Sequence, residues 1–340
     1  LDSTTPQAVG AFCAPAAIAA GQALRLQLRE QCGGCTQRAT RCEAVVQGQE
    51  VKLRLLGQSC TLPPDYACAA ICAELAKVTR MQTEALMATE VYNPSGQRNV
   101  PGWREVTDEK ELAKLNLDSQ DLTPTDSQFR SAVFTDGKGN YTIAFKGTTM
   151  DSASDWAANA GQGTTGYSSY YSRAKSIGRD AEAAIGHNDV KSVKFVGHSL
   201  GGGLASAAAH STGLPATTFN AAGLHLFNRS WFNAPPIDAV RVNGEILTGV
   251  QDSMRYVPIL APEAAGTPHP IDPAPGTASA YTRAQLNWVD ALLPVRGVAK
   301  YAKAALMRSG DLHLMSSVNP ALQARHDQLS RKAAAQGCRC

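Results

Sequence analysis

The sequence predicts an α/β fold with a mainly parallel sheet, to which a small Cys-rich N-terminal module is attached. Three observations lead to this prediction. From about residue 129 onwards, short apolar runs alternate with segments of helical spacing. At residues 197–201, a Gly-rich turn joins one such run directly to a helix-like segment. Seven of the nine cysteines lie within the first 72 residues, and the other two lie at the C-terminus.

The cysteine distribution sets the expected domain boundary. We expect a Cys-rich module at residues 1–75 and an α/β domain at residues 76–340, because residues 73–337 contain no cysteine. Alternating apolar residues predict a strand within residues 45–56. Helical spacing of apolar residues then predicts a helix from about residue 66 to residue 92.

Disulfide bonds are the preferred interpretation of the cysteines if the protein acts outside the cytosol, because a segment of this size builds only a small core. We therefore expect the module from Cys13 to Cys72 to be held by disulfides, as a satellite of the larger domain. A zinc site is the alternative, and reduced buried cysteines are a third interpretation. The zinc ligands would be Cys32, Cys35, Cys42 and Cys60. The odd total leaves at least one thiol unpaired or intermolecular.

Periodicity also defines the elements expected in the larger domain. They are strands at 129–134 and 141–145 with a hairpin turn at 136–140, a helix at 171–185, a strand at 193–196, a helix at 200–210, and strands at 217–219 and 239–246. Strands that alternate with helices in this way favour a parallel sheet.

Composition argues against several classes of protein. The formal net charge is +3, and no run of Lys and Arg forms a basic stripe, so we expect no nucleic-acid partner. Hydrophobic residues make up 44% of the chain, which is too many for a disordered protein. No unbroken apolar stretch reaches the length of a membrane span. The chain begins at Leu1, which indicates a piece of a longer polypeptide or a processed form.

The strongest chemical signal is the segment Gly197-His198-Ser199-Leu200-Gly201, which fits the pattern G-x-S-x-G. An apolar strand precedes it and a segment rich in Gly and Ala follows it, which is the strand–turn–helix order of a nucleophile elbow. Gly197 and Gly201 would let the strand and the helix approach closely. The helix N-terminus would also direct N–H groups at developing negative charge. Ser199 is therefore the candidate nucleophile.

A second motif, Phe145-Lys146-Gly147-Thr148-Thr149, ends a predicted strand that precedes the serine in the chain. A loop in this position supplies an N–H group to an oxyanion hole, and Thr148 is the candidate donor. The backbone N–H of Leu200 would supply the other donor. Asp155-Trp156 and Asn159 follow shortly after this loop.

In this order, the motifs resemble the lipase class 3 family, whose members carry a Phe-Arg-Gly-Thr-like loop, then Asp-Trp and Asn, then Gly-His-Ser-Leu-Gly-Gly. Lys146 replaces the Arg of that loop. The resemblance covers about residues 80–320 and implies an α/β-hydrolase fold, whose chemistry needs no metal or cofactor. The stretch from Gly201 to Gly223, with Phe219-Asn220-Ala221-Ala222-Gly223 at its end, is more similar still to bacterial phospholipase effectors that are delivered by type VI secretion.

The acid of a hydrolase triad follows the serine at the end of a strand in this fold. The segment Val240 to Leu247 resembles the family's strand that ends in Asn-Asp-Ile-Val, and Glu245 stands where the family has Asp. Glu245 is therefore the preferred acid, and Asp252 is the alternative.

The base of the triad should follow the acid along the chain. Residues 311–315 resemble the His-x-Met pattern that opens the last helix of the bacterial subset, so His313 is the preferred base. His269 is the alternative. We expect His198, inside the elbow, to pack against or support the site and not to act as the base.

The sequence thus predicts a serine ester hydrolase in which Ser199 attacks a carbonyl, His313 transfers the proton and Glu245 orients His313. The resemblance implies a lipid or phospholipid substrate and transient contact with a membrane surface. For the effector subset it further implies secretion, action in the periplasm of a target bacterium, and a cognate immunity protein. Two other interpretations stay open: an esterase for soluble esters, and a catalytically silent binding protein with a hydrolase fold.

Overall fold

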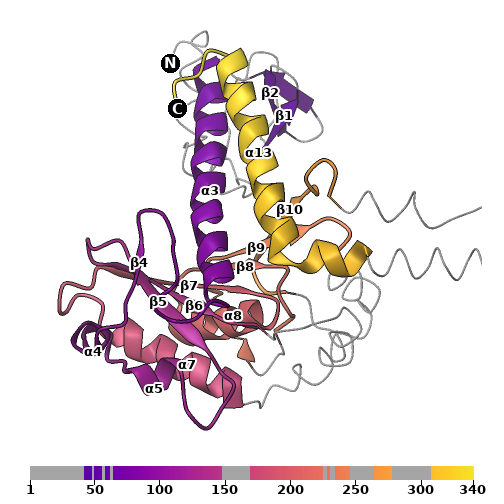
Figure 1. Cartoon of the computed structure of the whole chain (residues 1–340). Coiled ribbons are helices and arrows are strands. Elements are labelled where there is room, and N and C mark those ends of the chain that lie inside the picture. Colours follow the sequence, from indigo (N-terminus) through magenta and orange to yellow (C-terminus); the bar gives the residue numbers. More distant parts are fainter. Residues whose placement is uncertain are drawn as a thin grey trace, which may run out of the picture. The chain divides into compact units, whose positions relative to one another are not determined.

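The structure is a computed structural model, which describes residues 42–47, 50–55, 58–61, 64–147, 169–224, 228–229, 234–245, 264–277 and 308–340, with side chains from residue 67 onwards. The chain divides into two compact units, residues 1–80 with 324–340, and residues 81–323. The boundary between them falls within two long helices, α3 (Pro64–Glu90) and α13 (Met315–Ala335) (Figure 1). The expected module at residues 1–75 stays a prediction. The first compact unit differs from that module because it includes the C-terminal residues 324–340.

The first unit contains an antiparallel three-stranded sheet of β1 (Cys42–Gln47), β2 (Glu50–Leu55) and β3 (Gln58–Thr61). The strand predicted within residues 45–56 is confirmed by β2, and β1, which the sequence analysis did not predict, pairs with it. Gln47 pairs with Glu50, which leaves two residues between the strands. The sequence signal was Gly48 between two alternating runs, which is typical of a two-residue hairpin loop.

Two disulfides cross-link the first unit, Cys68–Cys338 and Cys72–Cys340. Cys68 and Cys72 are four residues apart on α3 and therefore share one face of that helix. The preference for disulfides is confirmed for these four cysteines, but the expectation that the bridges close within the N-terminal module is wrong for them. The side chains of the other five cysteines lie outside the described residues.

The second unit is built on a seven-stranded sheet in the order β10-β9-β8-β7-β6-β5-β4. The strands are β4 (Arg104–Glu105), β5 (Ser131–Thr135), β6 (Asn140–Phe145), β7 (Ser192–His198), β8 (Ala216–Phe219), β9 (Ile237–Val242) and β10 (Thr267–Ile271). Strands β6 to β10 are parallel, and β4 and β5 run antiparallel to their neighbours. The prediction of a mainly parallel sheet is confirmed, with an antiparallel edge where the predicted hairpin lies.

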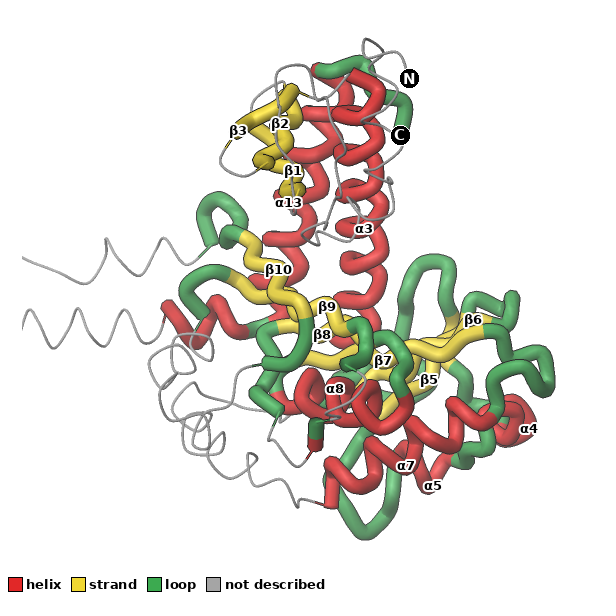
Figure 2. Tube along the Cα trace, turned by 180° about the vertical axis from the view of Figure 1, so that it is seen from behind, coloured by secondary structure: helices red, strands yellow, loops and turns green. Residues whose placement is uncertain are grey.

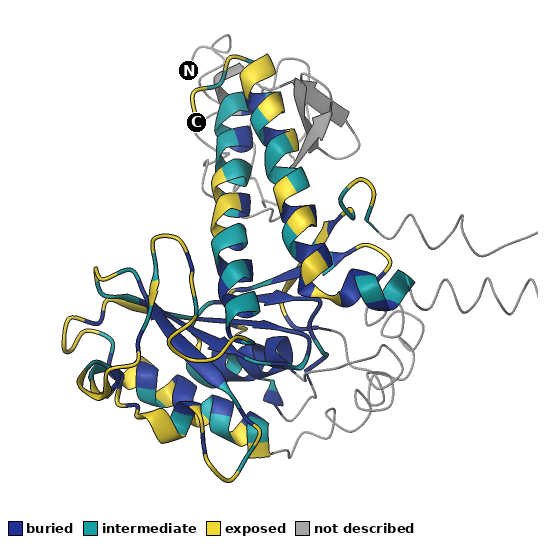
Figure 3. Ribbon diagram, in the orientation of Figure 1, coloured by how far each residue is buried: buried dark blue, intermediate teal, exposed yellow. Residues whose placement is uncertain are grey.

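Helices cover one face of the sheet (Figure 2), and the end of α3, with Met87 and Val91, packs on the other. The helices on the first face are the short α4 (Glu109–Leu112), the 3₁₀ turn η1 (Ala113–Leu115) and α5 (Ser119–Leu122), and the longer α7 (Ser169–Ala183) and α8 (Leu200–Thr212). The central strands and α8 are almost entirely buried (Figure 3). Within the described ranges, no helix is long and apolar enough to cross a membrane.

Alternation along the central strands divides their side chains between two cores. Ile143 and Phe195 belong to the core that α7 and α8 cover. Their neighbours in the strands, Ala144 and Val196, belong to a second core with Met87 near the end of α3. Strands buried on both faces explain why the sequence shows short continuous apolar runs here.

Strand β9 ends at Val242, four residues earlier than the sequence predicts. Gly244 has a φ of +87°, and the N–H of Glu245 donates to the carbonyl of Val242 at 3.1 Å. A glycine reaches this left-handed conformation without a steric penalty, so the chain turns directly after the strand. Glu245 therefore lies beyond the end of β9 and not within it.

The two disulfides should stabilise the folded chain by restricting the unfolded one. We expect the double substitution Cys68→Ser with Cys338→Ser to lower the free energy of unfolding by about 2–4 kcal/mol under oxidising conditions. Denaturant unfolding followed by tryptophan fluorescence measures this change. Under reducing conditions the variant and the wild-type chain should unfold alike, and a difference that persists there would contradict the assignment to the disulfide.

Candidate active site

Ser199 lies at the tight turn between β7 and α8 and is 4% exposed. Its backbone has a φ of 57° and a ψ of −124°, a conformation that non-glycine residues rarely adopt. Main-chain hydrogen bonds hold this turn, because the N–H of Ser199 donates to Phe219 at 3.1 Å and its carbonyl accepts from Ala222 at 2.9 Å. Strained serines held in this way are typical of a nucleophile at a strand-to-helix turn.

Glycines let β6, β7 and α8 meet beneath the serine. A Cβ atom on Gly197 would lie 2.1 Å from the carbonyl oxygen of Gly201, and one on Gly201 would lie 2.1 Å from the carbonyl oxygen of Phe145. Gly202 approaches Ala221 in the same way, with its hypothetical Cβ 2.6 Å from the Ala221 Cβ. These distances are too short for any side chain, so this is the close approach that the sequence predicts for Gly197 and Gly201.

A carboxylate and an imidazole meet in the interior of the second unit. The Nδ1 atom of His313 lies 2.8 Å from Oε2 of Glu245, and the two side chains are 4% and 0% exposed. Glu245 follows β9, and His313 precedes α13. A carboxylate on Nδ1 keeps the proton on that nitrogen, which leaves Nε2 for the chemistry of a general base.

His198 brings the segment of His313 beside the nucleophile elbow. Its Nε2 atom lies 2.7 Å from the carbonyl oxygen of His313, and the centroids of the two imidazole rings are 4.9 Å apart. Burial lowers the pKa of His198 to about 3, with a smaller contribution from His313. His198 is therefore neutral at physiological pH. The expectation that it packs against or supports the site stays a prediction.

Asn220 fixes the main chain around His313 and was not predicted as a site residue. Its Nδ2 donates to the carbonyls of Leu312 at 3.1 Å and His313 at 2.9 Å. Its Oδ1 accepts from the N–H of Val242 at 2.9 Å, at the end of the strand that leads to Glu245. The signal was present in the sequence as the segment Phe219 to Gly223, although the pattern gave no indication of this role.

The alternative base, His269, lies on β10 and has a different carboxylate partner. Its Nε2 lies 2.8 Å from Oδ1 of Asp238, and both side chains are partly exposed. The pair at His313 is buried and contacts the elbow, whereas the pair at His269 is partly exposed. A looser contact of 3.6 Å joins His326 to Asp327 on α13. Asp252, the alternative acid, lies outside the described residues.

The loop after β6 approaches the elbow through Gly147. A Cβ on this residue would lie 2.7 Å from the carbonyl oxygen of His198 and 2.5 Å from the hydroxyl of Tyr92. The N–H of Gly147 donates to that hydroxyl at 3.1 Å. Leu200 begins α8, which places its N–H among the free donors of that helix. The predicted donor Thr148 lies outside the described residues, as do Asp155-Trp156 and Asn159.

Comparison with known families identifies the chain. A family model described as a Tle-like phospholipase domain matches residues 83–271, which is more than half of the sequence. The chain belongs to this phospholipase-like family. The resemblance to lipases found in the sequence is confirmed, and so is the α/β-hydrolase fold that it implied.

One curated relative of this phospholipase-like chain is the extracellular phospholipase A1 of Serratia liquefaciens. The two are 34% identical over 218 residues, which cover 58% of this chain and 65% of that relative. The match thus spans less than two thirds of the relative's length.

Two solved structures also match. The first is the Rhizomucor miehei lipase propeptide complex, with 16% identity and a TM-score of 0.38. The match covers 58% of this chain and 67% of the lipase chain. The MDLA protein of Penicillium cyclopium has 12% identity, covers 64% and 84% of the two chains, and has a TM-score of 0.38.

The range matched by the phospholipase-like family contains Ser199 and Glu245 and ends before His313. The assignment of His313 as the base therefore depends on its contacts with Glu245 and His198. Among the described residues, no group of three or more His, Cys, Asp and Glu side chains could hold a metal ion. The zinc alternative at Cys32, Cys35, Cys42 and Cys60 falls on side chains that the structure does not describe.

The pairs His313–Glu245 and His269–Asp238 can be distinguished by mutation. We expect His313→Ala to lower ester hydrolysis by roughly 10³-fold or more, because a triad loses most of its function without its base. His269→Ala is the matched control and should lose much less, since Asp238 occupies its Nε2. Glu245→Gln should likewise cost more than Asp252→Asn. Steady-state kcat/KM for a chromogenic ester measures all four variants, and the reverse ranking of the histidines would assign the base to β10.

Proposed function

We propose that the chain hydrolyses carboxylic ester bonds of membrane phospholipids through an acyl-enzyme on Ser199. The observation that supports this function best is the buried contact of 2.8 Å between His313 and Glu245, next to the turn that holds Ser199. Membership of the phospholipase-like family supports the choice of a phospholipid over other esters.

In the proposed mechanism, Ser199 Oγ attacks the ester carbonyl while Nε2 of His313 accepts the serine proton. Glu245 holds the Nδ1–H of His313 and stabilises the imidazolium that forms. The N–H groups of Leu200 and Thr148 bind the oxyanion, and each such donor typically contributes about 2.7–4 kcal/mol to catalysis. His313 then protonates the departing alcohol, and water hydrolyses the acyl-enzyme with His313 as the base.

The preferred substrate bond is the sn-1 ester. The support is the relative from Serratia liquefaciens, which is named a phospholipase A1. On this proposal, the products are a free fatty acid and a lysophospholipid that keeps its sn-2 chain. The enzyme would contact a membrane surface transiently, because its substrate resides there.

We further propose that the protein is secreted and acts as an antibacterial effector in the periplasm of a target bacterium. Disulfides persist in oxidising compartments, and the bridges Cys68–Cys338 and Cys72–Cys340 fit such a location. The curated relative is described as extracellular. A producing cell would then need an immunity protein that blocks the site around Ser199.

The phospholipase function can be tested directly with Ser199→Ala. We expect the wild-type chain to release the sn-1 fatty acid from mixed-chain phosphatidylethanolamine in vesicles, detected by mass spectrometry. The alanine variant should lose this activity and keep its unfolding transition, because alanine fits the buried turn. A short soluble ester serves as the comparison substrate. Faster turnover of that ester than of vesicle lipid would favour a soluble-ester esterase, and activity of the pure variant would refute Ser199 as the nucleophile.

The site of action can be tested by targeted expression in a bacterial host. We expect the wild-type chain to lyse cells when a signal peptide directs it to the periplasm, since the disulfides form there and the lipid is accessible. The same chain without the signal peptide should be much less toxic. Periplasmic Ser199→Ala controls for toxicity without hydrolysis. Equal killing from both compartments would contradict the proposed location.

A further inference from the structure

We propose that Tyr92 and His198 form a hydrogen-bond relay that positions two main-chain segments around Ser199, the loop at Gly147 and the backbone of His313. Both would be positioning residues, which act through the groups that they hold. The expected kinetic effects rest on the proposed hydrolysis. The hydrogen bonds of the relay do not depend on it.

The relay begins at the carbonyl of His313, which can only accept a hydrogen bond. His198 Nε2 lies 2.7 Å from it and must therefore carry a proton. Burial keeps the pKa of His198 at about 3, so the ring is neutral and its Nδ1 must accept. The tautomer of His198 is thus determined by the oxygen that it contacts.

The hydroxyl of Tyr92 completes the relay on the other side of the ring. It lies 3.4 Å from Nδ1 of His198, a long contact in which the hydroxyl is the donor. The same oxygen accepts from the N–H of Gly147 at 3.1 Å. Burial raises the pKa of Tyr92 to about 12, so this donor keeps its proton. The direction of every bond in the relay follows from these assignments.

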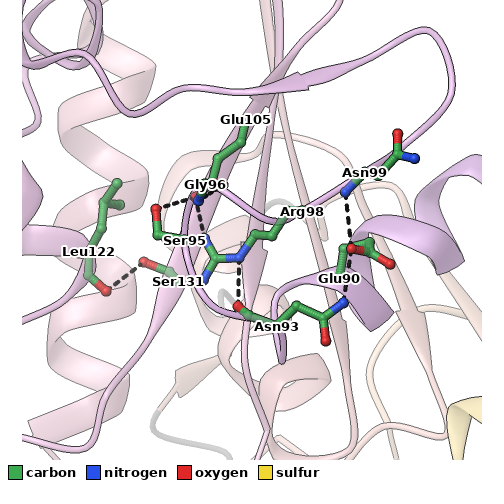
Figure 4. Close-up of polar contacts among 9 residues, drawn as sticks. All are labelled: Glu90, Asn93, Ser95, Gly96, Arg98, Asn99, Glu105, Leu122 and Ser131. Carbon is green, nitrogen blue, oxygen red and sulfur yellow. Dashed lines mark hydrogen bonds and ion pairs between the residues drawn. The ribbon is translucent and has the colours of Figure 1, made fainter.

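A polar loop after α3 holds Tyr92 in place. Glu90 Oε2 accepts from the side chain of Asn93 at 3.0 Å, and Arg98 Nε donates to the carbonyl of Asn93 at 3.0 Å (Figure 4). The same Arg98 forms a buried ion pair of 2.6 Å with Glu105 on β4. Because Tyr92 lies between Glu90 and Asn93 in the chain, this network restrains its backbone from both sides.

The loop at Gly147 is also restrained through the ring of Tyr92. The Nζ atom of Lys146 lies 5.5 Å from the centroid of this ring, within the range of a cation–π interaction. At the other end of the relay, Asn220 donates to the same carbonyl of His313 that His198 contacts. The relay therefore connects the chain beside the proposed oxyanion donor to the chain that carries the proposed base.

Removal of the Tyr92 hydroxyl would leave the N–H of Gly147 and Nδ1 of His198 without this partner in a buried environment. The loop would then shift to find other partners. Oxyanion donors act only within about 2.7–3.1 Å of the developing charge, and a misplacement of about 1 Å costs roughly 10²-fold in rate. The loss should therefore fall on kcat, because an oxyanion donor stabilises the transition state more than the bound substrate.

Tyr92→Phe tests the relay, because it removes one hydroxyl and keeps the ring under Lys146. We expect kcat for phospholipid in mixed micelles to fall by roughly 10–100-fold, with KM within about twofold of wild type. A trifluoromethyl ketone, which mimics the tetrahedral oxyanion, should bind more weakly by a similar factor. Tyr141→Phe is the matched control, since it removes the hydroxyl of a buried tyrosine at the opposite end of β6. It should leave kcat, KM and inhibitor affinity within about twofold.

Nitrogen NMR of His198 tests the relay without any activity measurement. With ¹⁵N-labelled histidine, the signal that disappears in His198→Gln should show a protonated Nε2 and an unprotonated Nδ1 at neutral pH. A protonated Nδ1 in the wild-type chain would overturn the proposal whether or not Tyr92→Phe folds. Two kinetic results would also overturn the proposal, provided that the wild-type chain is active. One is a folded Tyr92→Phe variant whose kcat equals that of the wild type, and the other is a variant in which only KM rises. A wild-type chain without esterase activity but with the predicted tautomer would refute the proposed function and leave the relay standing.

Discussion

The close approach of β6, β7 and α8 is the constraint on which the rest of the site depends. Gly197 and Gly201 have no room for a Cβ, and Gly201 packs directly against the main chain of Phe145. Beside this contact Ser199 adopts a positive φ of 57°, and the start of α8 lies against the end of β6. A larger residue at either glycine would separate the serine from the loop that is proposed to bind the oxyanion.

Buried polar groups around this turn hold one another in defined orientations. The carbonyl of His313 accepts hydrogen bonds from both His198 and Asn220, and the imidazole of His313 contacts Glu245. In an interior of low dielectric constant, an unpaired donor or acceptor is costly, so a network in which the partners match has few alternative arrangements. Such order is what an active site needs, because small displacements of catalytic groups reduce the rate strongly.

The disulfides lie in the first unit, whereas the candidate site lies in the second. Cys68 and Cys72 bind two cysteines that are 270 and 268 residues away in sequence, and all four lie in the first unit. A cross-link between residues so far apart in the sequence stabilises the folded chain by restricting the unfolded one. The cross-links supply this restraint, and they also fit a protein that works outside a reducing cytosol.

The sequence by itself determined the features that depend on neighbouring residues. The elbow at Ser199, the hairpin between β5 and β6 and the parallel sheet all follow from local patterns of glycine, apolar residues and turns. The resemblance to lipases added Glu245 and His313 as candidates, but it left Asp252 and His269 as alternatives.

The tertiary structure decided the features that depend on residues far apart in the chain. It joined Glu245 to His313 across 68 residues, Tyr92 to His198 across 106, and each cysteine of α3 to a partner at the C-terminus. No periodicity encodes such pairs, because they depend on the order of strands in the sheet and on where each strand ends. The end of β9 is an example. The turn at Gly244 ends this strand at Val242, whereas the local pattern predicted that it would continue for four more residues.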